Sequence, residues 1–186
     1  MKFFLTNLSD IQSQTDLISR YEALLSKAEK DRYQKMSNLN RRLQFLTGRA
    51  LIWESCGESP HLLENGKPVV SRGYISLAHS GNWVALAVSD TPIGIDIENT
   101  ATERSFDLIA ERLKFPPCSD RLSFYKNFTR YEADYKLGNS SEISHFYYSI
   151  GTFIICISSL NNKENIEFIK SIPLVCQTPS DLESVL

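Results

Sequence analysis

Hydrophobic residues in the first third of the chain recur at the spacing of amphipathic helices. The apolar positions between Ile11 and Leu25 keep approximate helical periodicity, with Ser9 and Asp10 before them as the predicted cap. A second run, from Leu39 to Glu54, has an apolar face and a polar face rich in arginine. Gly57 follows as a helix terminator. The pattern predicts two helices in this region.

The periodicity changes after residue 65. The stretch from Tyr74 to Ile97 is dense in β-forming residues and is broken by the turn segments HSGN and SDTP, which predicts antiparallel strands. A short helix is expected over Phe106–Leu113, and a long one over Arg121–Leu137, where Gly138 ends it. The remainder returns to strand, including IEFIKSIPLV. The sequence therefore predicts an α+β fold.

Two segments of the chain resemble each other. GNWVALAVS, Gly81–Ser89, matches GTFIICISS, Gly151–Ser159, in its glycine, large aromatic residue, branched aliphatic residue and final serine. Such repetition indicates one supersecondary unit used twice, with a ligand cleft between two halves. The alternative is that any two amphipathic strands look alike over nine positions. We divide the chain into an N-terminal subdomain of residues 1–100 and a C-terminal subdomain of residues 101–186.

Composition narrows the class of protein. The 186 residues are 42% hydrophobic with a formal net charge of −2, as in ordinary globular proteins. Near-neutral charge argues against nucleic acid as a main partner. The apolar part of MKFFLTNLSD is too short for a secretory signal, and no run approaches the ~20 apolar residues of a membrane span. We expect a cytoplasmic protein without a membrane partner.

Two carboxylates interrupt the apolar strand IGIDIE. Because side chains two residues apart in a strand point to the same side, Asp96 and Glu98 share one face and Ile95 and Ile97 the other. Two acids so close raise each other's proton affinity unless a cation neutralises them. A hard divalent ion such as Mg²⁺ is suited to this role. The alternative is an edge strand with two solvated acids.

Four further residues carry candidate chemistry. Glu132 and Lys136 lie four residues apart on one face of the long helix, where the acid could bind a metal and the lysine a phosphate oxygen, or both could form a surface ion pair. His79 follows an apolar strand and could contact a phosphate or be a structural histidine. Lys67 lies in the turn NGKP, where lysines are mostly solvated.

The order of these motifs resembles a known family. GKP, then SLAHSGNWVALAVSD, PIGIDIE and a helix containing FTRYEADYK are similar to the 4′-phosphopantetheinyl transferase superfamily, and in particular to its single-chain Sfp-type branch. NRRLQFLTGRALI is similar to that branch's GR-containing helix. The resemblance covers about Asp31 to Lys136. It implies two similar subdomains related by a pseudo-twofold axis, each a small antiparallel sheet packed against a long helix, in a monomer.

The resemblance also implies an activity and roles for residues. Members transfer the phosphopantetheine arm of coenzyme A to a serine of an apo carrier protein and release 3′,5′-ADP. By this resemblance Mg²⁺, with Mn²⁺ as an alternative, would be bound by Asp96, Glu98 and Glu132. Glu132 would also accept the serine proton, and Lys136 would stabilise the attacked phosphate. The coenzyme's phosphates would be contacted by Lys67, His79 and Arg32.

The sequence departs from the family pattern most in two places, beside a mild replacement of the family's tryptophan by Phe128. Ala78 precedes His79 where the family commonly has serine, and Tyr131 replaces a lysine that would lie beside the diphosphate. Losing one charge-assisted hydrogen bond costs about 1.5–3 kcal/mol. The main hypothesis is therefore a Mg²⁺-dependent transferase. The alternative is a weakened or silent homologue that binds coenzyme A or a carrier domain without transfer, and the sequence does not identify the carrier.

Overall fold

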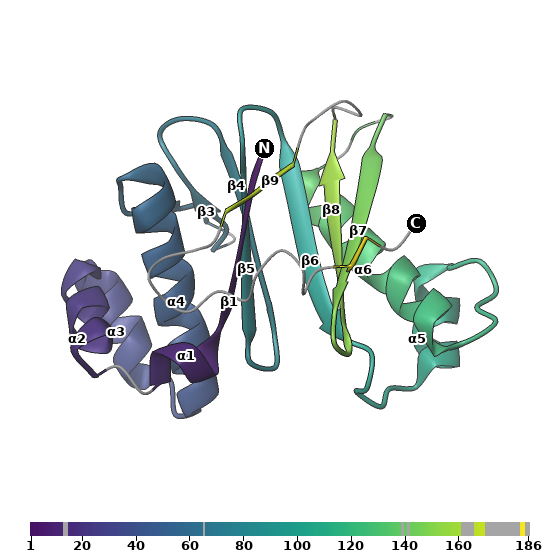
Figure 1. Cartoon of the computed structure of the whole chain (residues 1–186), viewed down its shortest axis with the longest axis horizontal. Helices are drawn as coiled ribbons and strands as arrows, with labels where there is room; N and C mark the ends of the chain where they lie inside the picture. Colours follow the sequence, from purple (N-terminus) through teal and green to yellow (C-terminus); the bar gives the residue numbers. More distant parts are fainter. Residues whose placement is uncertain are drawn as a thin grey trace.

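The chain forms four layers (Figure 1). The computed structural model describes residues 1–12, 15–64, 66–138, 140, 142–160, 166–169 and 183–184. Its helices and strands are, in chain order, β1 Lys2–Asn7, α1 Leu8–Gln12, α2 Thr15–Leu24, α3 Lys27–Lys35, α4 Leu39–Cys56, β2 His61–Leu62, β3 Pro68–Val69, β4 Tyr74–Ser80, β5 Trp83–Ser89, β6 Ile93–Asn99, α5 Phe106–Leu113, α6 Arg121–Leu137, β7 Ser144–Ile150, β8 Phe153–Ser159, β9 Glu167–Ile169 and β10 Glu183–Ser184.

Two four-stranded sheets form the inner layers. The first has the order β4-β5-β1-β9 and the second β10-β7-β8-β6. The pairs are antiparallel apart from the parallel pair of β1 with β9. Helix α4 packs on the first sheet and α6 on the second, so that the two helices form the outer layers. The predicted α+β fold, with small antiparallel sheets packed against helices, is confirmed.

The repeated sequence forms two hairpins of equal length. Strands β4 and β5 have seven residues each and are joined by a two-residue turn that begins at Gly81. Strands β7 and β8 have the same lengths, with Gly151 at the equivalent place. The two glycines have φ angles of 53° and 55°, which a side chain disfavours and which a tight hairpin turn requires at this position. One supersecondary unit is therefore used twice.

Strand β6 joins the two sheets. Its hydrogen-bonded neighbour is β8, but it also runs beside β4. Here serine side chains replace the backbone ladder: the Ile95 amide donates to Ser76 Oγ at 3.0 Å, and the Asn99 amide donates to Ser80 Oγ at 3.2 Å. Hydrogen bonding thus assigns β6 to the sheet of the C-terminal strands. The division of the chain at residue 100 stays a prediction.

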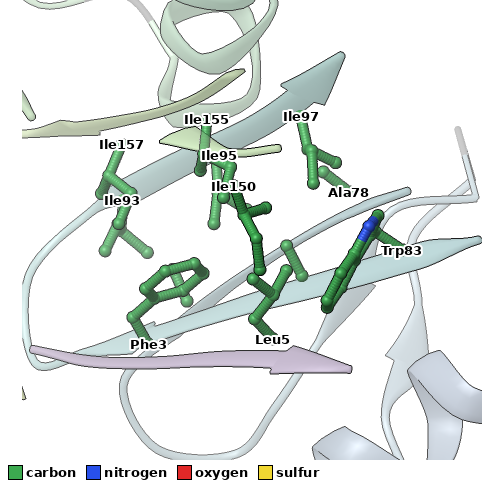
Figure 2. Packing of buried hydrophobic residues seen from close by; sticks show 12 residues of the cluster. Phe3, Leu5, Ala78, Trp83, Ile93, Ile95, Ile97, Ile150, Ile155 and Ile157 are labelled. Atoms are coloured by element: carbon green, nitrogen blue, oxygen red, sulfur yellow. The ribbon is translucent and has the colours of Figure 1, made fainter. Parts of the chain in front are cut away.

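The core between the sheets decides which way β6 faces (Figure 2). Alternate residues Ile93, Ile95 and Ile97 are buried against Phe3 and Leu5 of β1. Burying one such side chain fully stabilises the fold by about 1.5–3 kcal/mol. A register shift of one residue would place the acids in this core, so the isoleucines fix Asp96 and Glu98 on the opposite face, toward α6.

The N-terminal region differs from the sequence prediction. Residues 2–7 form β1, in the interior of the first sheet, where no strand was expected. The first helix begins at Leu8, so Ser9 and Asp10 lie inside it and the predicted cap there is wrong. Helix α3 was also missed, although Ser26 and Glu29 form a capping box at its start. A run buried on both faces has no alternation to identify it as a strand.

The other predicted elements are close to the observed ones. Helix α4 extends the predicted Leu39–Glu54 by two residues and ends at Gly57 in the left-handed region. Helices α5 and α6 have the predicted bounds, and Asp120 caps α6 by accepting from the Ser123 amide. In IEFIKSIPLV a strand forms at β9, while Pro173 lies outside the described residues. None of the described helices is both long and apolar enough to cross a membrane.

Candidate active site

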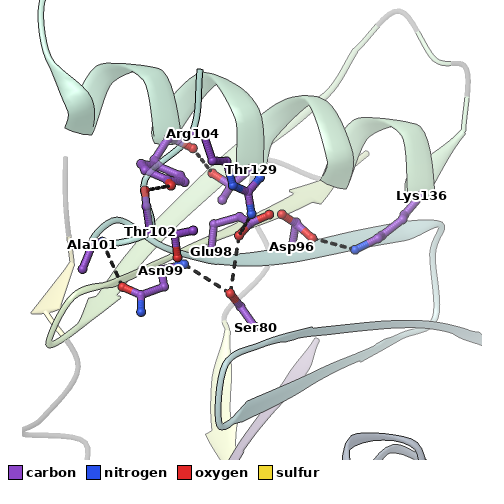
Figure 3. Close-up of polar contacts among 10 residues, drawn as sticks. Ser80, Asp96, Glu98, Asn99, Ala101, Thr102, Arg104, Thr129 and Lys136 are labelled. Carbon is purple, nitrogen blue, oxygen red and sulfur yellow. Dashed lines mark hydrogen bonds and ion pairs between the residues drawn. The ribbon is translucent and has the colours of Figure 1, made fainter. Parts of the chain in front are cut away.

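Asp96 and Lys136 meet where β6 packs against α6 (Figure 3). Lys136 Nζ donates to Asp96 Oδ1 at 2.7 Å and to the Ile95 carbonyl at 3.0 Å. The Asp96 side chain is 11% exposed and that of Lys136 is 26% exposed. Residues 40 positions apart are thus paired at a largely buried site. The structure brings together these two predicted residues.

The second oxygen of Asp96 has no hydrogen-bond partner among the described residues. Oδ2 is buried and accepts no hydrogen bond from the described residues. Burial raises the pKa of Asp96 to about 6; Lys136 opposes this, and the charges of Glu98 and Glu132 add to it. Glu132, half-buried on α6, is therefore near enough to act electrostatically on Asp96. A desolvated carboxylate oxygen is costly unless something binds it.

Glu98 is held by a residue that the sequence analysis missed. Arg104 Nη2 donates to Glu98 Oε2 at 2.8 Å, and Ser80 Oγ donates to the same oxygen at 3.4 Å. The guanidinium of Arg104 lies 5.0 Å from the ring centre of Phe128 on α6. Burial raises the pKa of Glu98, and Arg104 opposes this shift. Arg104 lies in a loop outside every motif, so no sequence signal pointed to it.

The carboxylates meet part of the requirement for a divalent metal. Asp96, Glu98 and Glu132 supply the oxygen ligands that Mg²⁺ prefers, and the orphaned Oδ2 of Asp96 needs a cation or donor. Across the described part of the chain, however, no three histidine, cysteine or acidic side chains are grouped closely enough to hold an ion. The side-chain pairing gives the reason, since Lys136 and Arg104 each bind one carboxylate. The donor chemistry therefore fits Mg²⁺, with a rearrangement of these two cations.

The shifted pKa of Asp96 predicts a measurable pH dependence of stability. Because the folded-state pKa of about 6 lies above the ordinary value of 3.8, the contribution of Asp96 to stability is complete below pH 4 and is lost as the pH rises through 6. Roughly two pKa units correspond to about 3 kcal/mol. The free energy of unfolding of Asp96→Asn, relative to that of the wild type, should therefore increase by about 3 kcal/mol from pH 4 to pH 7. Urea unfolding of both proteins with a chelator present measures this difference.

An exposed aspartate provides the control for this measurement. Asp90 lies in the turn before β6, and Asp90→Asn should change the free energy of unfolding by less than about 0.5 kcal/mol at both pH values. If the difference in the free energy of unfolding between Asp96→Asn and the wild type did not vary with pH, the raised pKa of the buried Asp96 carboxyl would be contradicted.

Lys67 and Lys136 line one groove. Lys67 Nζ donates to the backbone carbonyl of Lys136 at 2.7 Å, which ties the β2–β3 region to the end of α6. The groove between them has a volume of about 500 Å³ and is also lined by Ser76, Leu77 and Tyr135. Two ammonium groups on a groove of this size suit an anionic ligand with two phosphates.

Arg32 and His79 line an adjoining cavity of about 370 Å³. It shares Gly66, Pro68 and Leu77 with the groove of Lys67 and Lys136, so the two cavities lie side by side. Burial lowers the pKa of His79, and the charges of Lys136 and Arg41 lower it further. This lowering of the pKa favours the uncharged form of His79. Arg41 and Arg49 also line this cavity, and neither was singled out from the sequence.

The position of Arg32 is set by the contact between α3 and α4. Arg49 on α4 donates to Glu29 on α3 at 2.6 Å, and both side chains are almost fully buried. The second carboxylate oxygen of Glu29 accepts from the backbone amide and hydroxyl of Ser26 and so completes the capping box. Arg32 and Arg49 both lie over the ring of Phe45. Helix α3 is thereby fixed with Arg32 at the cavity.

The two departures from the family pattern lie in different surroundings. Ala78 is buried between the sheets, where a serine hydroxyl would be surrounded by apolar side chains. Tyr131 is 41% exposed and packs edge-to-face with Phe115, their ring centres 5.9 Å apart. Its neighbour in the structure is thus the segment after α5. Tyr131 itself brings no positive charge to this position.

One known protein matches part of the chain. The chain is 52% identical over 52 residues to the 4′-phosphopantetheinyl transferase psf-1 of Bacillus pumilus. The match covers 26% of this chain and 21% of that protein, so the chain spans about a fifth of the relative it matches. No family model matches the chain. The local identity supports the resemblance to phosphopantetheinyl transferases over this segment.

Proposed function

We propose that the protein is a 4′-phosphopantetheinyl transferase of the Sfp type. It transfers the phosphopantetheine arm of coenzyme A to a serine of an apo carrier protein, releases 3′,5′-ADP and works as a monomer with Mg²⁺. The resemblance of the motifs and the local identity to a named transferase support the reaction class.

The observation that carries the proposal is the grouping of the predicted coenzyme ligands. Lys67 and Lys136 line one groove, and Arg32 and His79 line the cavity that adjoins it. These four residues come from separate segments between Arg32 and Lys136, and they line two adjoining cavities. Coenzyme A carries a diphosphate and a 3′-phosphate, and two adjoining cavities lined by the cations Lys67, Lys136 and Arg32 would suit both. Chance grouping of four scattered residues on one surface is a weaker explanation.

The proposed chemistry follows from the residues around Asp96. The serine oxygen forms a bond to the β-phosphorus, the bond from that phosphorus to the bridging oxygen breaks, and the electron pair leaves with 3′,5′-ADP. Glu132 accepts the serine proton as a general base. Lys136, released from Asp96, stabilises negative charge on the attacked phosphate. Lys67, fixed by its bond to the Lys136 carbonyl, orients the diphosphate.

Asp96, Glu98 and Glu132 would hold Mg²⁺. The ion would supply charge neutralisation on the diphosphate. Asp96 would contribute the oxygen that accepts no hydrogen bond from the described residues, while Glu98 and Glu132 would complete the protein's share of the ligands.

A second candidate function is supported by one observation. Both carboxylates of β6 are paired with cations of the chain, and Tyr131 brings no positive charge to α6. A homologue that binds coenzyme A or a carrier domain without transfer would have these features.

A carrier assay distinguishes the two functions. The purified protein is incubated with coenzyme A, Mg²⁺ and a panel of apo carriers from fatty-acid, polyketide and nonribosomal-peptide systems, and intact mass is measured. We expect at least one carrier to gain the mass of one phosphopantetheine group at its serine. Coenzyme binding without labelling of any carrier that a known transferase modifies would support the second candidate. If the protein neither bound coenzyme A nor labelled any carrier, both candidate functions would be contradicted.

A groove variant ties the assay to the site. Lys67→Gln removes one of the two ammonium groups of the groove and should weaken coenzyme A binding about tenfold, the value of one charge-assisted hydrogen bond. Lys2→Gln removes an exposed lysine at the start of β1 and is the matched control, with binding expected within twofold of the wild type. Calorimetry measures both. Equal affinities of the two variants for coenzyme A would contradict a contact between Lys67 and the coenzyme.

A further inference from the structure

The carboxylate of Glu98 is already neutralised by a side chain of the protein, the guanidinium of Arg104. Arg104 Nη2 lies 2.8 Å from Glu98 Oε2, and the Glu98 side chain is only 14% exposed. The ion pair is therefore partly shielded from solvent, where a charge interaction is stronger than at an open surface. A second cation approaching Glu98 must act against this guanidinium.

The guanidinium of Arg104 is held by aromatic rings. Its central carbon lies 5.0 Å from the ring centre of Phe128 and 5.7 Å from that of Tyr125, both on α6. Stacking on two rings adds to the ion pair and restricts the side chain. Figure 3 shows Arg104 between α6 and β6, beside Glu98. Its charge is thus fixed at the candidate metal site.

The other cation of the site is less restrained. Lys136 donates to Asp96 and to the Ile95 carbonyl from one ammonium group on a flexible stem, and no described aromatic ring stacks on it. An incoming phosphate can therefore draw Lys136 away from Asp96. Arg104 does not line the groove, so a phosphate bound there would contact Lys67 and Lys136 first and leave Arg104 paired with Glu98.

We propose that Arg104 suppresses binding of a free divalent cation to Asp96 and Glu98, so that the cation binds together with the coenzyme's diphosphate. The inference rests on the proposed function. The diphosphate brings negative charge and oxygen ligands that offset the charge of Arg104, and Mg²⁺ commonly takes its remaining ligands from substrate phosphates. Arg104 is then a positioning residue: it orients Glu98 and couples metal binding to coenzyme binding. Such coupling is reciprocal between the two ligands.

Binding of Mn²⁺, measured by electron paramagnetic resonance with and without coenzyme A, tests the inference. In Arg104→Gln, free Mn²⁺ should bind about tenfold more tightly than in the wild type, because a nearby positive charge is lost. With saturating coenzyme A the two proteins should differ by less than threefold. The factor by which coenzyme A strengthens Mn²⁺ binding should therefore fall in the variant. If the role of Arg104 were purely structural, Arg104→Gln would instead bind Mn²⁺ more weakly both without and with coenzyme A.

Two control variants keep the test specific. Arg104→Lys retains the charge and should bind free Mn²⁺ within threefold of the wild type. The second control is Arg121→Gln. Arg121 also stacks on an aromatic ring, that of Phe106, and donates to the Thr100 carbonyl, but it pairs with no carboxylate in the described part of the chain. Its Mn²⁺ affinity should stay within twofold. Thermal unfolding of all variants confirms that each is folded.

The outcomes separate this inference from the proposed function. Unchanged or weaker binding of free Mn²⁺ to Arg104→Gln, in a protein whose wild type binds Mn²⁺ with coenzyme A, would overturn the role of Arg104 alone. A wild type that binds neither Mn²⁺ nor coenzyme A would overturn the proposed function and this inference with it.

Discussion

Asp96→Asn should reduce transfer of phosphopantetheine about a thousandfold or more. The amide keeps the shape of the side chain but loses the negative charge. That charge would bind Mg²⁺, and it now pairs with Lys136, whose Nζ lies 2.7 Å from Asp96 Oδ1. A metal supplies several kcal/mol of charge stabilisation to such a reaction, and each 1.36 kcal/mol is a factor of ten in rate. Single-turnover labelling of a carrier by wild type and variant measures the loss.

The effect should be confined to function. Because burial raises the pKa of Asp96, the neutral amide should not destabilise the protein at pH 7, so a loss of activity cannot be attributed to unfolding. The matched control is Asp90→Asn, an exposed aspartate before the same strand, which should retain more than half of the activity. Transfer by Asp96→Asn at more than a tenth of the wild-type rate would contradict the metal-ligand role of Asp96.

Gly94→Ala should have the largest effect on the fold. A Cβ atom at Gly94 would lie 1.8 Å from the Ala133 carbonyl oxygen and 2.9 Å from the Leu137 amide nitrogen, both in the backbone of α6. Backbone atoms cannot move aside as a flexible side-chain end can, so α6 must shift away from β6. Such overpacking costs 1–3 kcal/mol and occasionally more. We expect a loss of about 3 kcal/mol in the free energy of unfolding, measured in urea.

The displacement should also impair the site, since Lys136 on α6 would separate from Asp96 on β6. Gly48→Ala is the matched control, because its Cβ would meet a flexible side-chain end, Leu77 Cδ2, at 2.7 Å. Alanine also stabilises a helix interior by about 0.5–1 kcal/mol relative to glycine. Gly48→Ala should therefore stay within about 1 kcal/mol of the wild type. Similar stabilities for the two variants would show that the contact at Gly94 can relax.

Elements with strong local signals were predictable from the sequence. Helix α6 combines a capping aspartate, Asp120, with a terminating glycine, Gly138, and its predicted bounds are the observed ones. The hairpins were found by their repeated glycine and aromatic residues. The alternation in IGIDIE correctly separated the acids from the isoleucines, because the core accepts only one face of β6.

Elements whose identity depends on distant partners were missed. Strand β1 has four consecutive buried residues, so its sequence lacks the alternation of a strand with one wet face. Helix α3 is mostly polar and is fixed by the buried pair of Glu29 with Arg49. Its capping box, Ser26 with Glu29, was a local signal that could have identified its start.

The sequence by itself determined which residues carry the candidate chemistry: the acids of β6, the acid and lysine of α6, and the basic residues upstream. Spacing placed the acids on one strand face and Glu132 with Lys136 on one helix face, while the resemblance to a family gave Arg32, Lys67 and His79 their expected roles. Only the tertiary structure decided how these charges are paired. Lys136 binds Asp96 across 40 positions, and Arg104 binds Glu98 from a loop without a motif. Ion pairing depends on distances of a few ångströms between elements, and packing sets those distances.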